Sequence, residues 1–105
     1  MEKVNEKSTF DVEITFYDKD GTLVTPVSGT YRIDDLYSAT NIKPSASFVP
    51  ISSTHTITVS SSENAIVDSN KFSEIRVITI SYNYNASDVG TSEIRYELIN
   101  LTYYS

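Results

Sequence analysis

The stretch that decides the fold is IRVITISYNY, residues 75–84. Its even positions from residue 78 onward hold large apolar or aromatic side chains: Ile78, Ile80, Tyr82 and Tyr84. Successive side chains of a β-strand point to opposite faces, so this period of two predicts a strand with one face in the core. Ile75 and Val77 add apolar side chains to the other face. A strand with apolar residues on both faces is expected at the centre of a sheet.

Similar segments lie on both sides of this stretch and are separated by turn signals. Residues 10–17 alternate strictly between apolar and polar side chains, and DKDG (18–21) then predicts a turn. Further strands are expected at residues 30–34, 46–49, 54–60 and 91–103, with a hairpin loop at 85–90. No helical period of useful length is present. Short strands at close spacing predict an all-β fold, an immunoglobulin-like (fibronectin-type) antiparallel β-sandwich.

The 105 residues are enough for one domain. Residues 1–9 are mostly polar and are expected to form a flexible N-terminal arm, followed by the immunoglobulin-like domain over 10–105. Pro44 and Pro50 predict an irregular segment from 41 to 50 with only a short strand inside it. Residues 61–70 are expected to cross over between strands, with Ala65–Val67 inserted into the core. A change of apolar parity near Leu98 predicts a β-bulge or a change of facing partner.

Composition disfavours several classes of function. The formal net charge of −6 disfavours binding to nucleic acid or to an anionic membrane surface, and its simplest reading is solubility. The absence of cysteine fits folding in a reducing cytoplasm. MEKVNEKS, residues 1–8, has no apolar run of the kind found in a secretory signal, and no stretch has the length and apolarity of a membrane helix. We therefore expect a soluble, unprocessed chain.

Few residues suggest chemistry, and we expect no enzyme, cofactor or metal site. His55 is the single histidine, and it shares parity with Ile57, so it is expected at the margin of the core. No G-x-S-x-G elbow or other local motif supplies a nucleophile. Asp18 and Asp20 imitate part of a calcium loop. The first and the closing ligand positions of such a loop would be Phe16 and Val27, so a turn is the better interpretation. Two N-x-S/T sequons, at Asn85 and Asn100, are read as chance matches.

Tyrosines are the most informative candidates for binding, because aromatic side chains on a rigid sheet suit protein interfaces. Tyr82, Tyr84 and Tyr96 could form a platform for sugar rings, but their parity with core residues favours packing. The residues expected to be exposed and to contact a partner are Tyr17, Tyr37, Tyr103 and Tyr104.

Five segments in order carry a resemblance to a known group of proteins: DKDGTLVTP (18–26), YRIDD (31–35), NAIVDSN (64–70), EIRVITISY (74–82) and RYELINL (95–101). Together they resemble small immunoglobulin-like proteins encoded among the structural genes of tailed bacteriophages. The resemblance implies a non-catalytic virion protein that is present in the particle and binds capsid, portal, neck or tail subunits, with a homo-oligomer as one possibility. The alternative is a carbohydrate- or cell-surface-binding module, which requires exposed tyrosines in a row.

Overall fold

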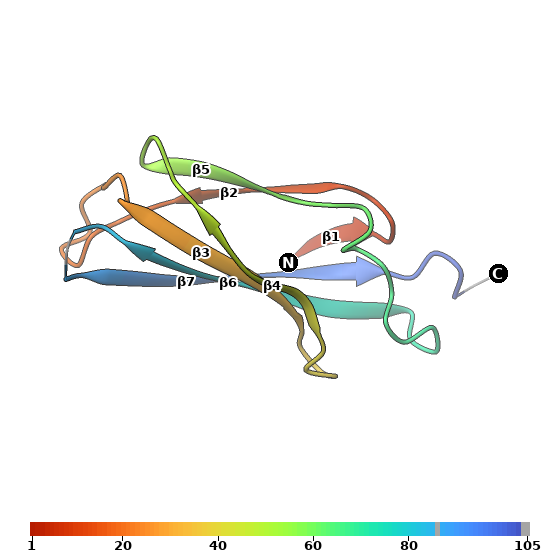
Figure 1. The fold of residues 1–105 in the computed structure, drawn as a ribbon. Helices are drawn as coiled ribbons and strands as arrows, with labels where there is room; N and C mark the ends of the chain where they lie inside the picture. Colours follow the sequence, from red (N-terminus) through yellow and green to blue (C-terminus); the bar gives the residue numbers. More distant parts are fainter. Residues whose placement is uncertain (86, 104–105) are drawn as a thin grey trace.

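The computed structural model describes residues 1–85 and 87–103, and these residues form seven β-strands in two stacked sheets (Figure 1). The strands are β1 Glu2–Asn5, β2 Phe10–Thr15, β3 Ser28–Asp35, β4 Asn41–Phe48, β5 Thr54–Val59, β6 Ser73–Asn83 and β7 Val89–Ile99. One sheet has the order β1-β7-β6-β3-β4, and the other pairs β2 with β5. The described residues contain no helix, and hence none long and apolar enough to cross a membrane. The predicted β-sandwich is confirmed.

Strand β6 is the centre of the larger sheet, as its sequence predicts. It pairs antiparallel with β3 on one side and with β7 on the other. Ile78 and Ile80 are fully buried, and Tyr82 is nearly so. The smaller sheet lies over this face and contributes Val12, Ile14, Ile57 and Val59 to the same core. Alternation on both sheets therefore buries one face of each against the other.

The N-terminal residues correct the expectation of a flexible arm over residues 1–9. Residues 2–5 form β1, which pairs parallel with β7 in the register Glu2↔Tyr96 to Asn5↔Ile99. Val4 is buried, although its neighbours in the strand are exposed. A single apolar residue among polar ones gives no alternation to detect. The segment is a strand because an edge of β7 is available to it, and local sequence cannot reveal that edge.

Two boundaries differ from the prediction for physical reasons. Strand β4 spans Asn41–Phe48, and it tolerates Pro44 because it is an edge strand whose register with β3 is irregular. Strand β7 ends at Ile99 and pairs with β6 without a register shift. The parity change near Leu98 is therefore the end of the strand and not a bulge, and Leu101 lies on the surface beyond it.

Removing the buried side chain of β1 tests whether this strand is part of the folded core. Val4→Ala is expected to lower the free energy of unfolding by about 1–2 kcal/mol, at roughly 0.8 kcal/mol for each buried CH₂. Lys3→Ala, at the exposed neighbouring position, is the control and is expected to change it by less than about 0.5 kcal/mol. Urea denaturation measures both. Equal effects of the two substitutions would contradict a docked β1.

Candidate contact surface

A buried arginine organises one end of the sandwich. The guanidinium of Arg76 on β6 is fully inaccessible to solvent. Its Nη2 donates to Oε1 of Glu74 at 2.7 Å, and its Nε donates to Oδ1 of Asp35 on β3 at 3.3 Å. Nη1 and Nη2 also donate to the carbonyl oxygens of Glu63 and Ala65, at 3.0 and 2.7 Å. A buried charge is tolerated only when it is paired and hydrogen-bonded in this way.

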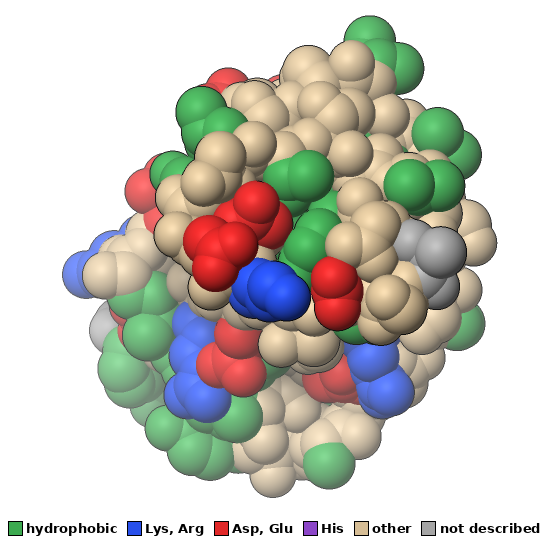
Figure 2. Space-filling view, turned by 90° about the vertical axis from the view of Figure 1, so that its left-hand side faces the viewer, with side chains coloured by type: hydrophobic (Ala, Val, Ile, Leu, Met, Phe, Trp, Pro, Cys, Tyr) green, Lys and Arg blue, Asp and Glu red, His purple; other side chains and the backbone are tan. Residues whose placement is uncertain are grey.

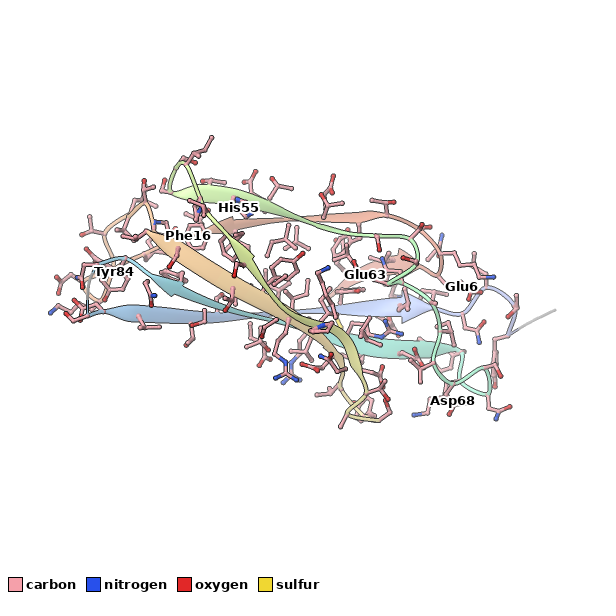
Figure 3. The ribbon with its side chains drawn as sticks, in the orientation of Figure 1. Glu6, Phe16, His55, Glu63, Asp68 and Tyr84 are labelled. Carbon is pink, nitrogen blue, oxygen red and sulfur yellow. The ribbon has the colours of Figure 1, made fainter. Side chains whose placement is uncertain are left out.

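The two carboxylates of this cluster hold the loops around it. Glu74 accepts hydrogen bonds from the backbone N–H groups of Val67 and Asp68. Asp35 accepts from both the N–H and the hydroxyl of Ser38, in the turn after β3. Arg76 and its carboxylates therefore fix the crossover loop 60–72 and the β3–β4 turn to the sheet. Figure 3 shows Glu63 and Asp68 at this end of the molecule.

Two buried asparagines tie the chain ends to the same region. The side-chain N–H₂ group of Asn64 donates to the carbonyl of Ser8, and its Oδ1 accepts from the Tyr96 hydroxyl at 2.6 Å. Asn100 donates to the carbonyl oxygens of Ser69 and Lys71. The prediction that Ala65–Val67 inserts into the core was wrong for two of these residues, and the buried residue at this point is Asn64. Ala65 is exposed and Val67 is about half exposed, whereas Ile66 packs partly on the core.

An exposed apolar surface lies over this polar framework. We call it the tip surface and define it as Tyr37, Lys71, Phe72, Leu101 and Tyr103. The Lys71 ammonium lies 5.8 Å from the centre of the Tyr37 ring, and the rings of Phe72 and Tyr103 meet edge to face at 6.1 Å. Tyr37 is 73% exposed and Phe72 52%. Large aromatic side chains left in solvent on fixed backbone are typical of protein interfaces.

The structure brings together two of the four predicted contact tyrosines. Tyr37 and Tyr103 flank the same loop, because they contact the consecutive residues Lys71 and Phe72. Tyr17 is also exposed but lies beside Phe16, near the end marked by Tyr84 in Figure 3, where its carbonyl accepts a hydrogen bond from Tyr82. Tyr104 lies outside the described residues. Among the described residues, the exposed tyrosines Tyr17, Tyr37 and Tyr103 therefore do not form the row that a sugar-binding platform requires.

The core tyrosines behave as their parity predicts. Tyr96 is fully buried and Tyr82 is 8% exposed, whereas Tyr84 is half-buried at the margin. The hydroxyl of Tyr84 accepts a hydrogen bond from the N–H of Lys19. Packing is thus confirmed as the role of Tyr82 and Tyr96.

The end of the molecule opposite the tip surface is built by the predicted DKDG turn. Asp18 Oδ1 accepts from the N–H groups of Asp20 and Thr22, and Gly21 has a φ of +81°, which glycine adopts without strain. Figure 2 shows this end, where small hydrophobic patches surround a group of acidic and basic side chains. The described residues contain no group of three or more histidine, cysteine or acidic side chains that could hold a metal ion.

The remaining sequence candidates have structural roles. The His55 ring stacks on Phe48 with centroids 4.6 Å apart and is partly buried, so its predicted place at the core margin is confirmed. Asn100, the asparagine of the second sequon, is 1% exposed, and its side-chain N–H₂ group donates hydrogen bonds to the carbonyl oxygens of Ser69 and Lys71. No pocket is found in the part of the chain that the structure describes.

A further ion pair, Lys43–Glu63, joins the crossover loop to the edge strand β4 of the larger sheet. Lys43 on β4 donates to Oε2 of Glu63 at 2.9 Å, and its ammonium lies near the Tyr31 ring. Burial alone would raise the pKa of Glu63, but hydrogen bonds from Ser60 and Lys43 outweigh it and leave the pKa below its usual value. The carboxylate of Glu63 therefore stays charged and keeps the loop attached.

Sequence reasoning missed the buried cluster, although a signal was present. Glu74 and Arg76 share the parity of Ile78 and Ile80, so two charged residues stand on the core face of the strongest strand. Such residues require buried partners. Their identity is not readable from the strand, because Asp35 lies 41 residues away in the chain.

Comparisons with known proteins support the fold alone. No family model matches the chain, and no curated protein matches it. Among solved structures, the crystal structure of the periplasmic chaperone SfaE is similar, with a TM-score of 0.59 and 8% sequence identity. The match covers 95% of this chain and 54% of the chaperone, so the chain spans about half the length of that protein. The chaperone has an immunoglobulin-like fold, and the predicted class is confirmed.

Removing the buried cation tests the organising role of Arg76. Arg76→Met leaves Asp35 and Glu74 without their cation, and it is expected to lower the free energy of unfolding by about 3–5 kcal/mol. Arg32→Met is the matched control, because Arg32 pairs with Asp34 at the surface, where solvent screens the pair, and a much smaller change is expected. Both are measured by chemical denaturation. Similar losses in the two variants would overturn the assignment.

Tyr96 predicts a specific dependence of stability on alkaline pH. Burial raises the pKa of Tyr96 to about 12, whereas an unfolded tyrosine titrates near about 10. Above about pH 10 the unfolded chain loses this proton and the folded chain keeps it. The contribution of Tyr96 to the free energy of unfolding is therefore complete below about pH 10 and is lost towards about pH 12.

Tyr96→Phe removes both this titration and the donor to Asn64. The variant is expected to be less stable by about 1–3 kcal/mol at neutral pH, and this deficit should narrow between about pH 10 and 12. Urea denaturation across this range is the measurement. A deficit that stays constant with pH would show that the hydroxyl titrates alike in both states.

Proposed function

We propose that this chain is a non-enzymatic structural protein of a tailed-phage virion, which binds a capsid, neck or tail subunit through its tip surface. It is made in the host cytoplasm and incorporated into the particle. The observation that carries this proposal is the gathering of exposed Tyr37, Phe72 and Tyr103 around Lys71 at one end of the domain.

The physical support for binding is that these side chains are exposed but attached to fixed backbone. Arg76, Glu74 and Asn100 hold the loops that carry them, so little conformational entropy is lost when a partner docks. Aromatic residues with one adjacent cation are the kind of anchor that dominates interface energies. The shape suits a contact at one end, because the domain measures 51 × 21 × 21 Å.

The virion part of the proposal is supported by the resemblance of the five sequence segments. Four of them contribute to the polar framework beneath the tip surface. YRIDD supplies Asp35, NAIVDSN supplies Asn64, and EIRVITISY supplies Glu74 and Arg76. RYELINL adds Tyr96 and Asn100. Segments far apart in sequence thus meet in one structural unit, which gives a physical reason for their occurring together.

Mass spectrometry of purified particles tests the proposal directly. Virions of the phage whose genome encodes this chain are expected to contain the polypeptide after density-gradient purification. Its absence from particles that contain their other structural proteins would rule out the virion role.

Substitutions in the tip surface test the docking site. Particles assembled with Phe72→Ser are expected to hold at least about tenfold less of the protein, because loss of an interface anchor costs about 2 kcal/mol or more. Val27→Ser is the control, because Val27 is 66% exposed and is bonded through its N–H to Asn83, away from the tip surface. Equal incorporation of both variants, each folded by circular dichroism, would place the docking site elsewhere.

A further inference from the structure

The two sheets have four edge strands, and three of them carry features that block pairing with another chain. Natural proteins protect such edges with charge, proline or short length. Strand β2 carries Asp11 and Glu13, β4 carries Lys43 and Pro44, and β1 has four residues. Strand β5 reads THTITV and has neither a charged residue nor a proline. Within the described residues it is the one edge strand without such protection.

Hydrogen bonds on β5 show which backbone groups face outward. Phe16 N–H donates to the carbonyl of Ser53 at 2.8 Å, so the bonded pairs with β2 fall on the odd residues of β5. The N–H and C=O groups of the even residues therefore point away from β2. Thr54 confirms this phase, because the Ser52 hydroxyl accepts from its N–H and donates to its carbonyl. No such cap is present on Thr56 or Thr58 in the described part of the chain.

We propose that β5 pairs antiparallel with β5 of a second copy, across a two-fold axis at Ile57. This pairing places Thr56 opposite Thr58 of the second copy and satisfies the outward N–H and C=O groups of both residues. The result is one continuous four-stranded sheet in the order β2-β5-β5-β2. In Figure 1, β5 lies at the top of the sandwich, next to β2.

The chemistry of β5 favours a second copy as the occupant. A two-fold axis pairs the strand with itself, so any charge on it would meet a like charge nearby. Strand β5 avoids this because Thr54, Thr56 and Thr58 are uncharged and β-branched, and cross-strand threonine pairs are favourable. The same operation on β2 would gather Asp11 and Glu13 of both copies. The inference is independent of the virion role, because it concerns this protein alone.

Sedimentation velocity on the full chain tests the pairing. A monomer–dimer equilibrium is expected as the protein concentration rises to about 1 mM. The affinity is expected to be weak, because a contact made by one strand of each copy buries a small area compared with most protein interfaces. The amide NMR signals of Thr56 and Thr58 are expected to shift over the same range. A monomer at every concentration, or concentration-dependent shifts confined to other strands, would overturn the proposal.

Charge reversal makes the test specific to β5. Thr56→Lys and Thr56→Glu are each expected to stay monomeric, whereas an equal mixture of the two should associate at least as strongly as the wild type. Thr30→Lys on the exposed face of β3 is the matched control and should leave association unchanged. A dimer that persists in Thr56→Lys, or a mixture that remains monomeric, would place the interface elsewhere or exclude it.

Discussion

The structure depends on one constraint: a guanidinium placed in the core has to be fully bonded. Arg76 meets this requirement by collecting two carboxylates and two backbone carbonyls from β3, β6 and the crossover loop. The two carboxylates then bind further backbone groups, so the crossover loop and the β3–β4 turn are attached to the larger sheet at several points. A loop of polar residues could not achieve this by hydrophobic burial, because it has few apolar side chains to bury. The buried cluster around Arg76 therefore holds the crossover loop in one defined arrangement on the sheet.

The sequence predicts the fold well where one face of a strand is buried. The alternation in residues 10–17 and 75–84 appears in the structure as β2 and β6, because apolar side chains at every second position have only one stable arrangement on a half-buried sheet. β1 and most of β4 escaped prediction for a common reason. Both are edge strands stabilised mainly by backbone pairing, which leaves little trace in side-chain pattern.

The candidate surface was predictable only in part. Tyr37 and Tyr103 were identified from residue type and position, and both are exposed at the same end. Phe72 and Lys71, which connect them, were not identified. These two residues come close to the tyrosines only because of the path that the crossover loop takes in the folded chain. That loop is placed by contacts between residues 31 and 32 positions apart, such as Asn100 with Ser69 and Tyr96 with Asn64. Pairings of this range are a property of the whole fold, and single-sequence patterns do not encode them.

The parallel pairing of β1 with β7 has a consequence for synthesis. Glu2 is synthesised well before its partner Tyr96, because β1 is the first and β7 the last strand of the described residues. The other strands can form the sandwich before β1 is paired, because β1 pairs with no strand other than β7 in the described residues. Val4 then enters the core late, because the pairing of β1 with β7 closes a loop that contains the five other described strands. A product that ends before β7 would leave β1 unpaired, so this parallel pair forms only after the last of the seven described strands has been synthesised.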